Sequence, residues 1–125
     1  MAKADGRMRY GDALQEIQDA LRSGGIRATL DGSKVQLPGV LIVPGVATYD
    51  RLNGEDYSAT VELWLLVGDK GIVQSLNQLS DLLEQVREVY EIHEVEPLTL
   101  SLPNSGGPDG LPALRTELNL NITKE

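Results

Sequence analysis

The residue with the most evident chemical potential is the single histidine, His93, within the run Glu-Ile-His-Glu-Val-Glu at residues 91–96. An imidazole beside carboxylates can bind a metal ion, but one histidine in a chain without cysteine makes a weak site. A solvated side chain at the end of a helix is the simpler interpretation of His93. A metal-dependent enzyme that uses His93 and acidic residues is the alternative.

Other combinations of residues that could support catalysis or binding are incomplete. Asp50, Glu55 and Asp56 flank a turn and offer oxygen ligands for a cation, but acidic residues are ordinary in turns. Gly106 and Gly107 lack the Gly-Lys-Ser/Thr ending of a phosphate-binding P-loop. No serine stands in a Gly-x-Ser-x-Gly run or near a histidine base in sequence. We therefore expect no catalytic residues, no cofactor and no metal site, and we expect that the chain is not an enzyme.

Composition and net charge argue against several further classes of protein. The 125 residues carry a formal net charge of −8, from 19 acidic and 11 basic residues, and include no cysteine. Affinity for nucleic acid comes mainly from neutralising phosphates, so an acidic chain is a poor candidate for a DNA-binding protein. The lack of cysteine excludes disulfides and thiolate zinc sites. No apolar run approaches the roughly 18 residues of a membrane span, and residues 1–10 lack the apolar core of a signal peptide.

Two long elements are expected to organise the fold: a strand over residues 56–67 and an amphipathic helix over residues 72–90. Odd positions of the strand are all apolar and predict one buried face, formed by Tyr57, Ala59, Val61, Leu63, Leu65 and Val67. Its even positions begin polar and end with Trp64 and Leu66, so its far end must be covered on both sides. The helix has a wide apolar stripe, formed by Ile72, Val73, Leu76, Leu79, Leu82, Leu83, Val86, Val89 and Tyr90.

Shorter elements precede the long strand. Residues 1–9 are expected to form a flexible tail and residues 10–125 a single domain. An N-cap at Asp12 predicts a first helix that ends at the glycines after Ser23, followed by a short half-buried strand over residues 26–30. The dipeptide that follows this strand, Asp-Gly, predicts a turn, and a hairpin return after it is left open.

The segment before the long strand is apolar and fenced by two Pro-Gly pairs. It covers residues 37–45 (Leu-Pro-Gly-Val-Leu-Ile-Val-Pro-Gly) and suits a sheet edge or an extended crossing strand, because proline cannot donate to a ladder. A strand over residues 46–52 is expected to turn at Asn53-Gly54 into the long strand.

The C-terminal part predicts two strands around an exposed loop. Residues 94–102 alternate as a strand, and residues 103–112 are too rich in proline and glycine for helix or strand. A final strand covers residues 113–123, with Leu114, Leu118, Leu120 and Ile122 inward. The whole order predicts an α+β domain with a largely antiparallel mixed sheet and two helices packed on one face.

Several residues suggest contacts with other proteins rather than catalysis. Trp64 and Leu66 emerge on the otherwise polar face of the long strand, either covered by the first helix or the Pro-Gly-fenced strand, or part of a subunit interface. The loop over residues 103–112 is either a connection with no function of its own or an arm that docks on a partner. The candidate interface residues are Trp64, Leu66, Val40, Ile42, Asn104, Ser105, Gly106, Gly107, Pro108 and Asp109.

The sequence resembles tail terminator (tail completion) proteins of long-tailed, siphovirus-like phages. The resemblance spans nearly the whole chain after residues 1–9. It is carried by five stretches, which are residues 37–45 given above, 49–52 (Tyr-Asp-Arg-Leu), 62–68 (Glu-Leu-Trp-Leu-Leu-Val-Gly), 76–86 (Leu-Asn-Gln-Leu-Ser-Asp-Leu-Leu-Glu-Gln-Val) and 111–114 (Leu-Pro-Ala-Leu).

This resemblance implies a structural virion protein that is assembled in the host cytoplasm and resides in the tail and neck. It implies a ring of six copies that caps the tail tube, stops its polymerisation and offers a surface for head-tail joining. The implied partners are other copies of the chain, the tail tube protein and a head-tail connector or stopper protein. In such a ring the sheets are expected to line the bore and the helices to face outward. The acidic balance suits a bore through which DNA passes without specific binding.

Two other functions remain open beside this resemblance and the metal-dependent enzyme. A head-tail connector or stopper (head completion) protein would share the size and composition of a tail terminator. A small non-viral interaction module would be a dimer that uses the surface around Trp64 and Leu66.

Overall fold

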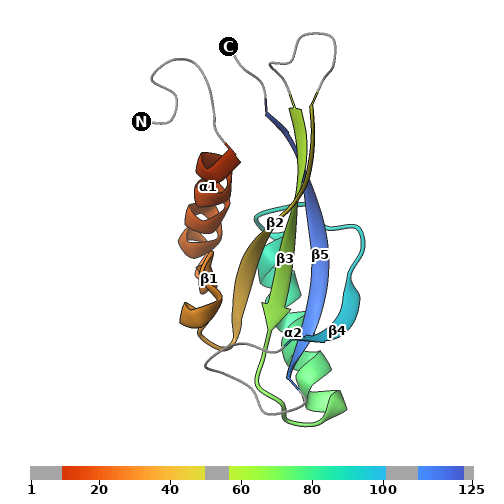
Figure 1. The fold of residues 1–125 in the computed structure, drawn as a ribbon. Coiled ribbons are helices and arrows are strands. Elements are labelled where there is room, and N and C mark those ends of the chain that lie inside the picture. Colours follow the sequence, from red (N-terminus) through yellow and green to blue (C-terminus); the bar gives the residue numbers. More distant parts are fainter. Residues whose placement is uncertain (1–9, 50–56, 101–109, 123–125) are drawn as a thin grey trace.

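The computed structural model describes residues 10–49, 57–100 and 110–122. The elements are α1 (Tyr10–Ser23), β1 (Ala28–Thr29), the 3-10 helix η1 (Gly32–Lys34), β2 (Gly39–Tyr49), β3 (Tyr57–Leu66), α2 (Ile72–Arg87), β4 (Glu96–Leu100) and β5 (Leu111–Ile122). They form an α+β fold around a five-stranded sheet of order β1-β2-β3-β5-β4 (Figure 1). Only β1 and β2 pair in parallel, so the predicted fold class, a largely antiparallel mixed sheet, is confirmed.

Both helices pack on the same face of this sheet, as expected. Ile17 and Leu21 of α1 share one buried core with Leu79, Leu82 and Val86 of α2. The sheet contributes the inward side chains of its three long strands to this core, namely Val40, Ile42, Val61, Leu63, Leu65, Leu114 and Leu118. Among the described residues, no helix is both long and apolar enough to cross a membrane. We call the side of the sheet that faces this core the helix-covered face, and the opposite side the helix-free face.

The long central strand β3 has the two-sided character that its sequence predicts. Its odd positions from Ala59 to Leu65, and Val67 just beyond the strand, are at most 2 % exposed. Leu66 is also fully buried, although its side chain points to the opposite face. The far end of β3 is therefore covered on both sides. The side chain of Tyr57 lies outside the described residues.

Residues 39–45 of the Pro-Gly-fenced segment and residues 46–49 of the strand expected after it form one strand, β2. A register shift between Pro44 and Ala47 marks a bulge, which takes up the proline without ending the strand. β1 covers only the first part of the outer side of β2, through pairs at Val40 and Leu41. Beyond Leu41, no strand of the described residues pairs with the outer side of β2, so the prediction that this segment forms a sheet edge holds there. The Asn53-Gly54 turn between β2 and β3 lies outside the described residues.

The side chain of Tyr10 joins helix α1 to the bulge of β2. The hydroxyl of Tyr10 donates to the carbonyl oxygen of Thr60 at 2.8 Å, and the Gly45 N–H donates to the Tyr10 oxygen at 3.1 Å. A side chain at Gly45 would collide with the hydroxyl and carbonyl oxygens of Thr60. The glycine therefore lets the tyrosine hydroxyl satisfy backbone groups that the bulge leaves without ladder partners.

The segment between α1 and β2 departs from the predicted strand and possible hairpin. Helix α1 ends where Gly25 adopts a positive φ of 84°, and the Ile26 N–H donates to the Leu21 carbonyl oxygen at 3.0 Å, a glycine stop of the predicted kind. After it only Ala28 and Thr29 form a strand, and this strand pairs in parallel with β2. The Asp-Gly turn becomes the N-terminus of η1, because Asp31 accepts the Ser33 N–H at 2.9 Å.

The C-terminal strands start and end differently from the predictions. β4 covers Glu96–Leu100, within the predicted strand over residues 94–102. β5 begins at Leu111, inside the segment expected to be a loop. Leu111 pairs with Leu100, and Pro112 lies where β3 has already ended, so its missing N–H costs no ladder bond with β3. The rest of the predicted loop, residues 103–109, lies outside the described residues.

Candidate functional site

The helix-free face of the sheet is the candidate functional surface. One row of cross-strand neighbours on this face runs from Leu41 through Trp64 and Arg115 to Glu96. Side chains directly opposite each other on one sheet face are in contact distance. The row therefore joins an apolar region near β2 to a charged region near β4.

The apolar region of this face is a small second core. Its buried residues are Leu41, Leu66, Leu111 and Ala113. Partly buried apolar side chains pack around them, namely Val35, Leu37, Val43, Trp64 and Leu100. Residues of the Pro-Gly-fenced strand thus cover Trp64 and Leu66, one of the two explanations open from the sequence.

The charged region is organised around Arg115. Its guanidinium lies 3.0 Å from a carboxylate oxygen of Glu62, 2.8 Å from Glu117 and 3.8 Å from Glu96. The Trp64 indole N–H donates to Glu62 at 2.9 Å. The hydrogen bond from Arg115 lowers the pKa of the Glu62 carboxyl; burial opposes this, and the Trp64 indole adds to the lowering. Glu62 is therefore held as an anion between the apolar and charged regions.

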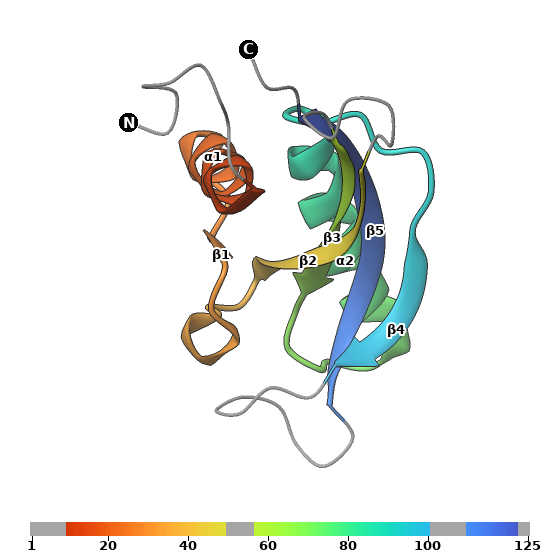
Figure 2. The ribbon, with the colours of Figure 1, turned by 45° about the horizontal axis from the view of Figure 1, so that its top comes forward.

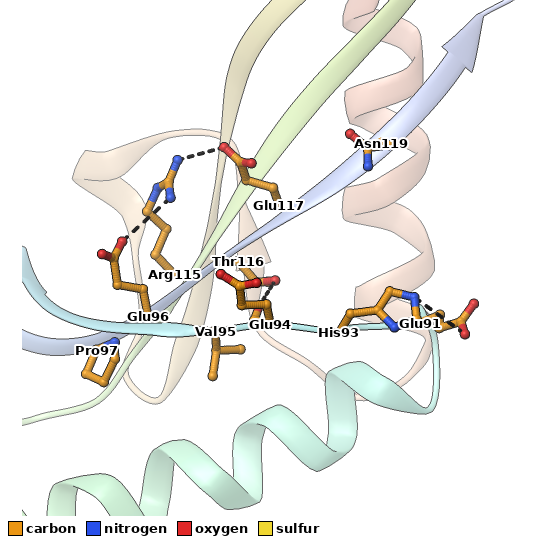
Figure 3. Close-up of a pocket in the computed structure, with 10 residues that line it drawn as sticks. All are labelled: Glu91, His93, Glu94, Val95, Glu96, Pro97, Arg115, Thr116, Glu117 and Asn119. Atoms are coloured by element: carbon orange, nitrogen blue, oxygen red, sulfur yellow. Dashed lines mark hydrogen bonds and ion pairs between the residues drawn. The ribbon is translucent and has the colours of Figure 1, made fainter.

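A cavity of about 470 Å³ lies beside this charged region, where the chain between α2 and β4 diverges from β5 (Figure 3). Its charged lining comprises the four carboxylates of Glu91, Glu94, Glu96 and Glu117, together with Arg115 and His93. The Thr116 hydroxyl donates to the Glu94 carbonyl oxygen at 2.6 Å and ties the diverging segment to β5. The cavity is strongly acidic, which sequence reasoning missed because the register of β5 beside residues 91–96 is a tertiary feature.

His93 lies at the rim of this cavity without the surroundings of a catalytic or metal-binding residue. Its side chain is 79 % exposed, and its Nε2 atom lies 3.6 Å from a Glu91 carboxylate oxygen. In the described ranges, no three His, Asp or Glu side chains are grouped closely enough to hold a metal ion. The second candidate cation site, formed by Asp50, Glu55 and Asp56, lies outside the described residues.

The first turn of α2 carries apolar side chains that the helix-covered core does not bury. Ile72 is 79 %, Val73 72 % and Leu76 42 % exposed. The prediction that these three residues belong to a buried stripe was wrong, while Leu79, Leu82 and Val86 confirm the rest of it. In Figure 1 this first turn extends past the end of β3. Helical periodicity shows which side of a helix is apolar, but not how far the facing sheet extends.

Most of the candidate interface residues fall either inside the two cores or outside the described residues. Val40 and Ile42 are at most 1 % exposed in the helix-covered core, and Leu66 is fully buried in the second core. These three side chains therefore offer no surface to a partner, because the chain's own packing uses them. Trp64 remains partly accessible on the helix-free face. The other six, Asn104, Ser105, Gly106, Gly107, Pro108 and Asp109, lie outside the described residues.

Comparison of the chain with models of known protein families and with curated proteins finds no match. The resemblance to tail terminator proteins therefore stays a prediction.

Proposed function

We propose that this chain is a structural virion protein that caps the tail tube of a long-tailed phage as a ring, and that it acts through contacts between copies and not by catalysis. The ring, of six copies in this proposal, stops polymerisation of the tube protein and offers the surface to which the head-tail connector binds. Its place is the tail and neck of the virion, after assembly in the host cytoplasm. The sequence resemblance described above is the starting point of this proposal.

The observation that carries the proposal furthest is the one-sided sheet. Both helices cover one face, and the other face has a small apolar core at one end and the charged network of Arg115 beside it. A ring whose sheets line a bore requires subunits of this kind, with helices outward and a helix-free face inward. Figure 2 shows α1 near one edge of the sheet and β4 at the other, which leaves two different edges for contacts between neighbours.

The charge of the helix-free face also supports a bore that DNA crosses without binding. Glu62, Glu96 and Glu117 lie on this face around one arginine, Arg115. The arginine is engaged by these carboxylates and is not free to bind phosphate. Like charges repel at close range, so a carboxylate-rich lining keeps DNA mobile.

The exposed apolar residues of α2 support a protein partner beyond the ring itself. Ile72, Val73 and Leu76 present apolar side chains from consecutive turns at one end of the domain. Exposed apolar side chains that cluster in this way are typical of protein contact sites. The tail tube protein and the head-tail connector are the partners that the proposal assigns to the two rims of the ring.

Electron microscopy of particles made without this gene tests the proposal. Overlong or irregular tails that carry no heads are the expected result. Tails of normal length that float free of heads would identify the chain as a head-tail connector or stopper instead. Normal infectious particles would contradict both functions.

The exposed apolar residues at the start of α2 favour a second candidate function, a small interaction module with no viral role. Such a module would form a dimer through Ile72, Val73 and Leu76. Sedimentation velocity distinguishes the two functions. A concentration-dependent dimer that never forms rings, and that Ile72→Ser abolishes, would favour the module.

A further inference from the structure

Strand β5 has an open edge next to the acidic cavity. β4 pairs with β5 only from Leu111 to Arg115, whereas β5 continues to Ile122 and pairs with β3 throughout. In the described part of the chain, no strand pairs with the other side of β5 beyond Arg115. An unpaired strand edge is a template on which an extended segment can add.

The backbone N–H and C=O groups on the unpaired side of β5 point toward the cavity. The Val67 N–H donates to the Pro112 carbonyl oxygen at 3.3 Å, so the backbone groups of Pro112 point toward β3. Backbone groups of successive residues in a strand point to opposite sides, and the register of β5 with β3 has no shift. The backbone N–H and C=O groups of Glu117 and Asn119 therefore point away from β3, and both residues line the cavity.

Charge determines what kind of segment fits this edge. The carboxylates of Glu91, Glu94 and Glu117 line the cavity, and Arg115 is already paired with carboxylates. A second acidic strand would meet like charges here, whereas a basic extended segment would form ion pairs beside the backbone hydrogen bonds.

The opposite edge of the sheet does not supply such a segment. Pro44 and a bulge interrupt the ladder of β2, and the Tyr10 hydroxyl already binds the backbone of Gly45. Direct pairing of β2 from one copy with β5 of another is therefore blocked at this point. Another segment of the chain is therefore the candidate for this edge.

The basic segment that fits is the one that precedes Tyr10. Residues 1–9 read Met-Ala-Lys-Ala-Asp-Gly-Arg-Met-Arg, with Lys3, Asp5, Arg7 and Arg9 at odd positions and alanine or methionine at most even ones. In an extended conformation this alternation places the three cations, together with the one carboxylate of Asp5, on one side, which remains basic. Nine extended residues span at most about 30 Å.

We propose that residues 1–9 of one copy bind as an added strand along the open β5 edge of a neighbouring copy, with their basic side chains against Glu91, Glu94 and Glu117. Helix α1, which this segment precedes in the sequence, lies near one edge of the sheet, and the open part of β5 lies toward the other edge (Figure 2). Contacts between two different surfaces are head-to-tail and close into a ring when the rotation allows it. This inference rests on the proposed ring and names its contact. It replaces the expectation that residues 1–9 are only a solvated tail.

Charge reversal in two separate full-length variants tests the contact. One variant carries Arg7→Glu with Arg9→Glu, and the other carries Glu91→Lys with Glu94→Lys, which leaves the Arg115 network intact. The concentration at half assembly is measured by sedimentation velocity and native mass spectrometry. Each variant alone should need at least about a tenfold higher concentration than the unmodified chain. An equimolar mixture should assemble again, because each segment then meets an edge of opposite charge.

A control matched to the Glu91→Lys and Glu94→Lys variant is Asp81→Lys with Glu88→Lys, which makes the same change in net charge at exposed positions of α2 and its C-cap and should assemble as the unmodified chain does. Failure of the mixture to assemble, or binding of the segment within its own copy, would overturn the inference. Rings that form equally well with all variants would overturn it while the proposed function stands. An unmodified chain that stays monomeric at all concentrations, also with tail tubes added, would contradict the proposed function and this contact together.

Discussion

The two faces of the sheet differ in what covers them, although the same strands form both. On the helix-covered face, α1 and α2 enclose one large core in which side chains of β3 such as Leu63 and Leu65 are fully buried. On the helix-free face, only the segment before β2 and the ends of neighbouring strands enclose Leu66. Burial in this protein therefore depends on what lies opposite a side chain, and much less on its place in the strand.

The two faces also differ in role, because residues of one face stabilise the fold and residues of the other can contact partners. The helix-covered face is mainly apolar, with Thr116 as a buried polar exception, and its residues are used in holding the fold together. The helix-free face changes from apolar to charged along the row from Leu41 to Glu96. Groups that are charged and partly accessible contribute little to folding but can select partners.

Consecutive residues of β3 give the sharpest test of this comparison. Leu65→Ala should lower the free energy of unfolding by about 4 kcal/mol, because the side chains between the sheet and the helices cannot move enough to fill the space that the shorter side chain leaves. Leu66→Ala should cost only about 2–3 kcal/mol, because the second core is small and borders solvent. Urea denaturation of both variants measures the difference. Equal losses would show that the two cores are equally rigid.

Helix α2 allows the same comparison along one element. Leu79→Ala should cost about 3 kcal/mol, since its side chain is 1 % exposed. Leu76→Ala, one turn earlier and 42 % exposed, should cost less than about 1 kcal/mol. Thermal or urea unfolding of the two variants gives the values. A loss below about 0.5 kcal/mol for Leu79→Ala would place the helical stripe outside the core.

The contact between α1 and the bulge of β2 should contribute less than either core. Tyr10→Phe removes the hydroxyl that binds Gly45 and Thr60 but keeps the ring, so we expect a loss of about 1 kcal/mol. Hydrogen exchange should accelerate at the Gly45 amide while the amides of β3 opposite β5 stay protected. An unchanged Gly45 amide would show that the hydroxyl is not its partner in solution.

The charged region of the helix-free face should give the smallest effect, and a pH-dependent one. The pKa of Glu62 is lowered in the folded chain, so its contribution is complete above the unfolded-state pKa of about 4.3 and disappears as the pH falls through the lower folded pKa. Glu62→Gln should therefore reduce stability at pH 7, by less than about 1 kcal/mol, and progressively less as the pH falls through the lowered folded pKa of Glu62. Urea titrations over a series of acidic pH values measure this.

Glu84→Gln is the matched control, because Glu84 forms an exposed ion pair with Arg87 at 3.2 Å on a single helix. It should change stability less than Glu62→Gln at pH 7. If Glu62→Gln lowered the free energy of unfolding by the same amount at every pH, the shape of the Glu62 side chain and not its charge would be what stabilises the fold.

Much of the fold followed from local patterns. The alternation of β3 predicted its buried face, and the apolar residues after Trp64 predicted cover on both sides. The stop of α1 followed from glycine, which alone adopts the positive φ at Gly25 without strain. The interface prediction was less successful, because Val40, Ile42 and Leu66 read as exposed edge or patch residues but are buried.

By itself, the sequence determined most of the element types, the α+β class and many residues of the main core, because these depend on periodicity and on glycine and proline within a few residues. Only the tertiary structure decided the strand order, the parallel pairing of β1, the exposure of Ile72 and the meeting of β5 with the glutamates of residues 91–96. These features depend on which distant segments face each other and on where each facing surface ends. Local periodicity carries no information about either, so the open, acidic edge of β5 became visible only in the folded chain.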